Sequence, residues 1–195
     1  MTETVQQYVE RMLGLAGDGD PLEVLRGTAH RLAALITARS DEDLRYTSSP
    51  GRWSTGAILA HLADADVVAS YRIRMILASP GVEIQAFDQN AWAAAFRYTN
   101  QDPFASLALF QSLRLAWLAL LDAVAASEPD DSWRARYGVH QERGQESIGH
   151  LLRLYAGHDL NHVQQIERLL DERDRERGSS PPAFERRPIK PVIGS

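Results

Sequence analysis

Apolar residues recur at intervals of three and four along most of the chain, which is the spacing of an amphipathic helix. Asp20-Pro21 and Asp102-Pro103 add start signals, because aspartate caps a helix and proline suits its first turn. Ser54 and Ser147 are the cap residues of two further stretches. The pattern predicts four long helices, at residues 21–38, 54–77, 103–126 and 148–173. We therefore expect an all-α protein, a four-helix bundle.

The segments between these helices carry weaker signals. Residues 2–16 form a short amphipathic stretch, predicted to be an extra N-terminal helix, and residues 78–102 form a long crossover with one short helical piece. Residues 128–143 are polar and irregular, which indicates a loop or a small hairpin, and no series of strands is apparent. We expect a single domain at 1–178, with its core at 20–173. The tail, 179–195, is rich in Pro, Ser and Arg and is predicted to be extended or disordered.

Charge, hydropathy and cysteine content exclude or disfavour several classes of partner and of site. The 195 residues carry a net charge of −5 without a basic stripe, so a nucleic-acid partner is disfavoured. The most apolar stretch, 107–126, is interrupted by Gln111, Arg114 and Asp122, and the N-terminus lacks an apolar signal segment, so we expect a cytoplasmic protein without a membrane partner. The chain has no cysteine, which excludes disulfides, thiolate ligands and a cysteine nucleophile.

Two histidines lie on the apolar stripe of the last predicted helix. The stripe runs Ile148, Leu151, Tyr155, His158, His162, Ile166, Leu169. Residues four apart lie on one face of a helix, so both imidazoles could bind one ion. The alternative is a pair of hydrogen-bonded core histidines.

A third histidine, His61, lies on the inward stripe of the predicted helix 54–77, between Ile58 and Ala65. A lone histidine there would be read as a core residue. Three inward histidines on two helices of a bundle instead predict a divalent-metal site on His61, His158 and His162. Three protein ligands leave coordination positions open, as in catalytic sites. Zinc suits three histidines best, and nickel, iron and manganese are alternatives.

Other polar residues are candidates with ordinary alternatives. Asp64 follows His61 by one turn and is a candidate general base or hydrogen-bond acceptor for a ligand, or else a surface carboxylate near Arg72 or Arg74. Arg72 and Arg74 are candidates for binding the carboxylates of a thiol cofactor, or else form a solvated face. Gln165 could hydrogen-bond near the site.

Several motifs resemble those of the DinB/YfiT-like family, in the expected order over residues 20–173. They are RWSTGAILAHLADADVV (52–68), FDQNAW (87–92), FQSLR (110–114), GQES (144–147) and HDLNHVQQI (158–166). The resemblance implies a four-helix bundle that holds a metal on the three histidines above, and it implies homodimers.

The resemblance also implies a range of activities. Family members include transferases that depend on bacillithiol, mycothiol or glutathione, a mycothiol-dependent isomerase and hydrolase-like proteins. We therefore expect an enzyme in which the metal activates a low-molecular-weight thiol or water for reaction with a small-molecule substrate, with S-transfer as the leading reaction. The alternatives are a metal-dependent hydrolase and a stress protein that binds a metal or small ligand without turnover.

Overall fold

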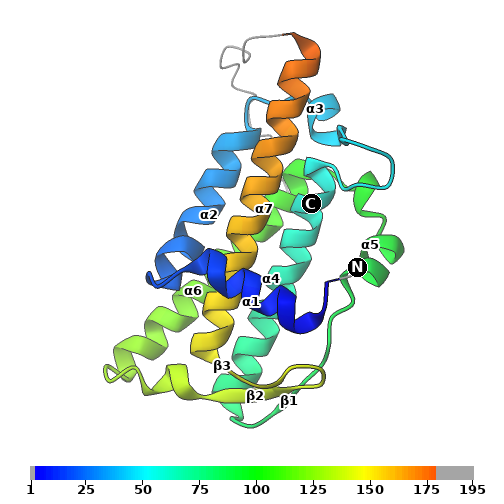
Figure 1. The fold of residues 1–195 in the computed structure, drawn as a ribbon. Coiled ribbons are helices and arrows are strands. Elements are labelled where there is room, and N and C mark those ends of the chain that lie inside the picture. The colour runs from blue at the N-terminus through cyan, green and yellow to red at the C-terminus, as the bar shows by residue number, and fades with distance from the viewer. Residues whose placement is uncertain (1–2, 179–195) are drawn as a thin grey trace, which may run out of the picture.

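The computed structural model describes residues 3–178 and consists mainly of helices. The long helices are α2 (Pro21–Ile36), α4 (Thr55–Ala78), α6 (Pro103–Ser127) and α7 (Ile148–Arg177). The shorter ones are α1 (Val5–Ala16), α3 (Asp41–Arg45), α5 (Gln89–Ala95) and the 3-10 turns η1 (Tyr98–Asn100) and η2 (Ser132–Ala135). The long helices run side by side as a bundle (Figure 1), which confirms the predicted fold class. The predicted tail lies outside the described residues.

Side-chain caps fix where the long helices begin. Asp20 and Asp102 each accept a hydrogen bond from a backbone N–H of the following turn, and a proline occupies the first turn of both helices. Ser54 and Ser147 cap α4 and α7 in the same way. Because these caps set the helical phase, they determine which side chains of α4 and α7 face the core.

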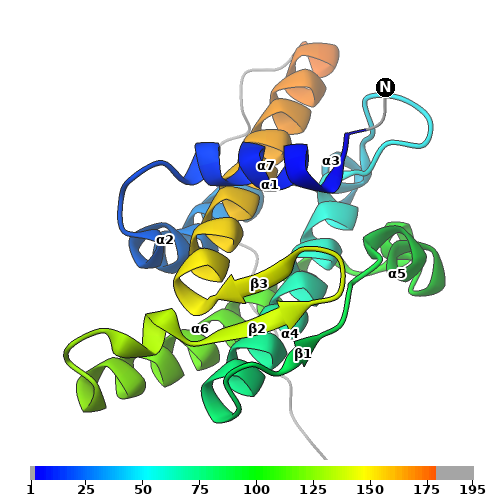
Figure 2. The same ribbon diagram turned by 60° about the horizontal axis from the view of Figure 1, so that its bottom comes forward.

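Three short strands correct the expectation that the chain has no strand series. They are β1 (Glu83–Ile84), β2 (Tyr137–His140) and β3 (Gly144–Ser147), in the order β1-β2-β3. β1 pairs with β2 in parallel, and β2 and β3 form the hairpin that was one alternative for this region. Strands of two to four residues are too short for a clear alternating pattern. The sheet lies where α4 ends and α7 begins (Figure 2).

A buried arginine joins four helices at the centre of the bundle. Arg114 of α6 forms ion pairs with Asp66 of α4 at 2.8 Å and with Asp159 of α7 at 2.6 Å. Its guanidinium also donates to the backbone oxygen of Leu25 in α2 at 2.9 Å. Because these partners surround one side chain, Arg114 fixes how α4 and α7 lie relative to each other.

Helix α6 is also the one helix within residues 3–178 that is long and apolar enough to cross a membrane, judged by length and composition alone. Its face with Phe110 and Trp117 is buried in the bundle, and Arg114 is on the same side. The opposite face exposes Leu109 and Leu115. One face of α6 therefore packs into the bundle, and the other lies at the surface of the described structure.

Helix α1 crosses over α7 (Figure 1) and contacts it closely. Met12 is fully buried, and a Cβ atom built on Gly157 would lie only 1.8 Å from the Met12 backbone oxygen. Arg11 also donates a hydrogen bond to Asn161 at 2.9 Å. Helix α1 therefore covers the turn of α7 that contains His158.

Candidate metal site

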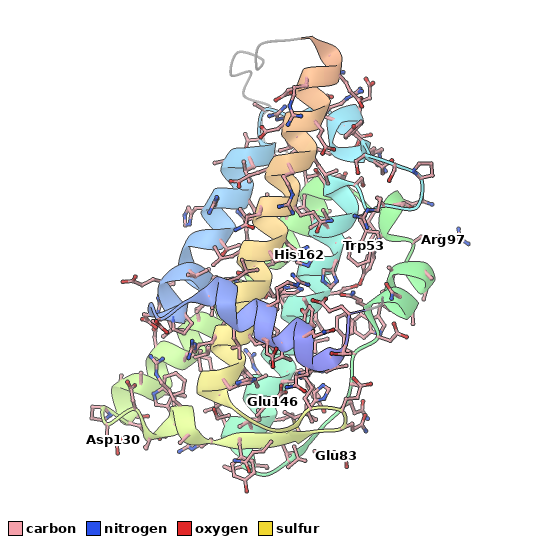
Figure 3. The ribbon with its side chains drawn as sticks, in the orientation of Figure 1. Trp53, Glu83, Arg97, Asp130, Glu146 and His162 are labelled. Atoms are coloured by element: carbon pink, nitrogen blue, oxygen red, sulfur yellow. The ribbon has the colours of Figure 1, made fainter. Side chains whose placement is uncertain are left out.

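The three predicted histidines converge. One ring nitrogen from each of His61, His158 and His162 lies within 4.8 Å of the others. The Nε2 atoms of His61 and His158 are 3.0 Å apart. All three side chains are buried, with residue exposures of 1%, 8% and 8%. His162 is labelled in Figure 3. The inward stripes inferred from sequence therefore meet in space.

The arrangement fits a divalent ion. Tetrahedral bonds of 2.0–2.1 Å place ligand nitrogens about 3.3 Å apart, within the range of separations seen here. The Nδ1 of His162 faces the Oε1 of Gln165 at 3.1 Å, which favours a proton on Nδ1 and a lone pair on Nε2. A hydrogen bond between His61 and His158 would explain their contact but would leave His162 without a role.

Burial keeps the three imidazole rings neutral, which is the form that can bind a metal ion. Burial lowers the pKa of His61 to about 3 and that of His162 to about 4. Burial, reinforced by the neighbouring histidines, lowers the pKa of His158 well below its usual value. Neutral imidazole is the form that binds metals, so all three side chains are ready to do so at pH 7.

Asp64 does not contact the ligands. Its carboxylate accepts a hydrogen bond from the Tyr98 hydroxyl at 2.6 Å, whereas the buried Nδ1 of His61 has no hydrogen-bond partner within the described residues. Asp64 also forms no ion pair with Arg72 or Arg74 among the residues described. The structure thus gives Asp64 a different contact from both readings of the sequence, and the carboxylate ties η1 to α4.

The two candidate arginines lie on different sides of α4. Arg72 is buried, lines the cavity beside the histidines and donates to the backbone oxygen of Gln85 at 2.6 Å. Arg74 is exposed, donates to Ser70 on its own helix and does not line the cavity. Residues two apart on a helix differ by roughly 200° in direction, which separates the pair.

A cavity of about 570 Å³ adjoins His61 and His158. Its walls come from α4 and α7, from the start of α1, from residues 86–90 of the crossover and from the turn between β2 and β3. Tyr8 of α1 and Tyr155 of α7 line it, and sequence reasoning assigned neither a role. Tyr155 lies one turn before His158 on the same apolar stripe, so the sequence alone could have placed its side chain beside the histidines.

Aromatic side chains enclose the histidines on the side of the crossover. The ring of Trp53 lies 5.0 Å from that of His61, and the ring of Phe87 is stacked at 6.3 Å (Trp53 is labelled in Figure 3). Trp92 packs edge-on against Phe87 at 4.7 Å. These rings form an apolar wall on one side of the histidines.

The chain is similar to several proteins that are described as putative metal-dependent hydrolases. A putative metal-dependent hydrolase of Oceanobacillus iheyensis is 27% identical over 135 residues, which are 69% of this chain and 75% of that protein. YfiT of Bacillus subtilis, which carries the same description, is 25% identical over 76% of this chain and 81% of its own. A solved structure of YfiT, described as "a probable metal-dependent hydrolase with an unusual four-helix bundle topology", matches with a TM-score of 0.69 at 24% identity and covers 92% of both chains. The family model of the DinB superfamily matches residues 25–166. The chain belongs to the DinB superfamily.

Proposed function

We propose that this protein is a metal-dependent enzyme that acts on a small molecule in the cavity beside His61 and His158. One observation carries the proposal: three neutral, buried imidazoles offer ring nitrogens within 4.8 Å of one another, and two of these rings, His61 and His158, line a cavity of about 570 Å³. Structural metal sites normally have four protein ligands, whereas three leave positions open to the cavity.

A divalent ion held there would lower the pKa of water or of a thiol and so supply a nucleophile at neutral pH. The protein's own contribution is to hold the rings in place. Gln165 orients His162, and Arg114 anchors Asp159, the residue after His158. The names of the relatives support hydrolysis, and activation of a low-molecular-weight thiol is the second candidate.

The first experiment tests the metal. The protein is stripped with a chelator, reloaded separately with zinc, nickel, iron or manganese, and analysed by mass spectrometry for metal content. We expect one ion per chain for the wild type and for His30→Ala, which removes an exposed histidine of α2. We expect His162→Ala to lose the ion while keeping its helical circular dichroism. Wild-type protein that stays empty after reloading would exclude the mechanism.

The second experiment separates the reactions. The loaded wild type and His162→Ala are assayed on a panel of esters and amides without thiol, and then on electrophiles with glutathione, mycothiol or bacillithiol. Turnover without thiol, abolished in His162→Ala, supports hydrolysis. Turnover only with thiol supports S-transfer. Metal binding without any turnover would favour the binding protein instead.

A further inference from the structure

Arg72 is a buried cation without a buried counter-ion. The residue is 7% exposed, yet it forms no ion pair with a carboxylate within residues 3–178. Its Nη2 donates to the backbone oxygen of Gln85, but its Nη1 and Nε donate to no carbonyl or carboxylate of the described chain. A buried charge normally requires a partner, and this guanidinium faces the cavity.

The neighbouring His140 cannot serve as that partner. Its Nε2 lies 3.3 Å from Nη2 of Arg72, and its Nδ1 accepts a hydrogen bond from the backbone N–H of Glu142 at 3.2 Å. Burial, together with the nearby Arg143 and Arg72, lowers the pKa of His140 to about 4, so the ring is neutral at pH 7. A neutral imidazole has one acceptor nitrogen, which the Glu142 N–H already occupies. The ring therefore brings no negative charge to Arg72.

The carboxylates around the cavity have other partners or lie in solvent. Glu146 is buried but pairs with Arg143 at 2.6 Å. Glu3 pairs with Arg11 at 2.8 Å, and Asp88 caps α5 through two backbone N–H groups. Glu142, on the turn between β2 and β3, is exposed. The buried part of the cavity wall therefore keeps the positive charge of Arg72.

Tyr155 adds a hydroxyl beside this charge. It lines the cavity, and its buried hydroxyl has no hydrogen bond of normal geometry within the described residues. Burial raises the pKa of Tyr155, whereas Arg72 lies near enough to act in the opposite direction. The phenol therefore stays protonated at pH 7 and can donate a hydrogen bond to an oxyanion.

The pair lies at a fixed distance from the histidines. His61, Ala65, Val68 and Arg72 all line the cavity along one stripe of α4. The Cα atoms at its two ends are about 16 Å apart along the helix axis, at roughly 1.5 Å per residue. On α7, Tyr155 precedes His158 by one turn. An elongated small molecule can therefore reach the histidines with one end and Arg72 with the other.

We propose that Arg72 and Tyr155 form a subsite for an anionic group, a carboxylate or a phosphate, of the molecule that reacts at the three histidines. Arg72 supplies charge-assisted N–H donors, and Tyr155 supplies an O–H donor. The inference rests on the proposed function in one respect only, namely that the other end of the bound molecule reacts at the three histidines. Anion binding itself needs no metal.

Isothermal titration calorimetry with inorganic phosphate, and separately with glutarate, tests the subsite at constant ionic strength set with sodium chloride. Metal-stripped and metal-loaded full-length proteins are compared. Arg72→Gln removes the charge, Tyr155→Phe removes only the hydroxyl, and Arg74→Gln is the matched control on the same helix. We expect Arg72→Gln to bind at least about tenfold more weakly, as for loss of a charged hydrogen bond, and Arg74→Gln to match the wild type.

The anion that binds more tightly shows whether the subsite prefers a phosphate or a carboxylate. Arg72→Gln should weaken the binding of both anions. Equal binding by Arg72→Gln and wild type, or no binding by stripped or loaded wild type, would overturn the subsite. If Arg72→Gln does not fold, Tyr155→Phe and Arg72→Lys replace it, with weaker binding expected for the first and partial retention for the second. Arg72-dependent binding by a protein that cannot hold metal would remove the proposed function and leave the subsite.

Discussion

Replacing Gly157 by alanine should detach or displace α1, although alanine is the better helix former. In an exposed helix the change would stabilise the protein by about 0.5–1 kcal/mol, because glycine loses more backbone entropy on folding. Here the new Cβ would lie 1.8 Å from the Met12 backbone oxygen and 2.6 Å from its carbonyl carbon. Both atoms are backbone, so no side-chain rotation relieves the contact.

The size of the effect follows from this distance. Ordinary contact begins at 3.4 Å, so the two helices must separate by about 1.6 Å, which forfeits much of the van der Waals contact around the fully buried Met12. Overpacking of this kind costs about 1–3 kcal/mol, more than the propensity gain. We expect Tm to fall by about 2–12 °C, at roughly 2–4 °C per kcal/mol for a chain of this size.

The assay combines thermal unfolding with hydrogen exchange of the α1 amides. Gly27→Ala is the matched control, because Gly27 lies on the exposed side of α2, where an added Cβ would meet no atom within 4 Å, and it should raise Tm. Gly157→Ala should also lose protection over residues 5–16, since α1 would no longer dock. A Gly157→Ala protein with a Tm at or above wild type and fully protected α1 amides would refute the close-approach argument.

Three further predictions concern buried and half-buried polar groups. Arg114→Met leaves two buried aspartates without a cation and should cost about 3–5 kcal/mol by urea unfolding, whereas Arg26→Met breaks an exposed pair and should cost less than about 1 kcal/mol. Asp64→Asn should leave metal content unchanged and cost about 1 kcal/mol through its bond to Tyr98; loss of the ion would restore Asp64 as a partner of the ligands. In metal-free protein the folded-state pKa values of the three histidines lie below the unfolded value of 6.5, so the unfolded chain binds more protons and stability should fall from about pH 6.5 downwards, by up to about 1.4 kcal/mol per pH unit for each histidine. Constant stability between pH 7.5 and 5 would contradict burial of neutral rings.

The long helices and the convergence of the three histidines were predictable because both depend on local, periodic information. Apolar spacing and caps set the phase of α4 and α7, and this phase turned His61, His158 and His162 inward. Their convergence follows once the two helices pack against each other. The strands and α3 gave no such signal, because elements of two to five residues are too short for periodicity to be visible.

Contacts made between elements were harder to predict. Asp64 lies one turn from His61, so helical spacing suggested a contact with the ligands. Its side chain instead accepts from Tyr98, which reaches α4 from a 3-10 turn 34 residues further along the chain. Residue spacing along one helix cannot predict a hydrogen-bond partner that belongs to the crossover segment. Asp159 shows the same limit, since its partner Arg114 belongs to α6.

Two signals in the sequence were nevertheless sufficient to place residues that sequence reasoning left undecided. Counting about 100° per residue, Arg72 lies roughly 20° from His61 on the helical wheel of α4, whereas Arg74 lies roughly 220° away. The wheel alone therefore assigns Arg72 to the cavity side and Arg74 to the opposite side, as the structure has them. Gly157 is the second signal, because a glycine within a helix, beside a ligand and far from either cap, indicates a close backbone approach. The element that approaches is α1, and the same contact brings Tyr8 to the cavity wall, so the residue that admits the helix also completes the site.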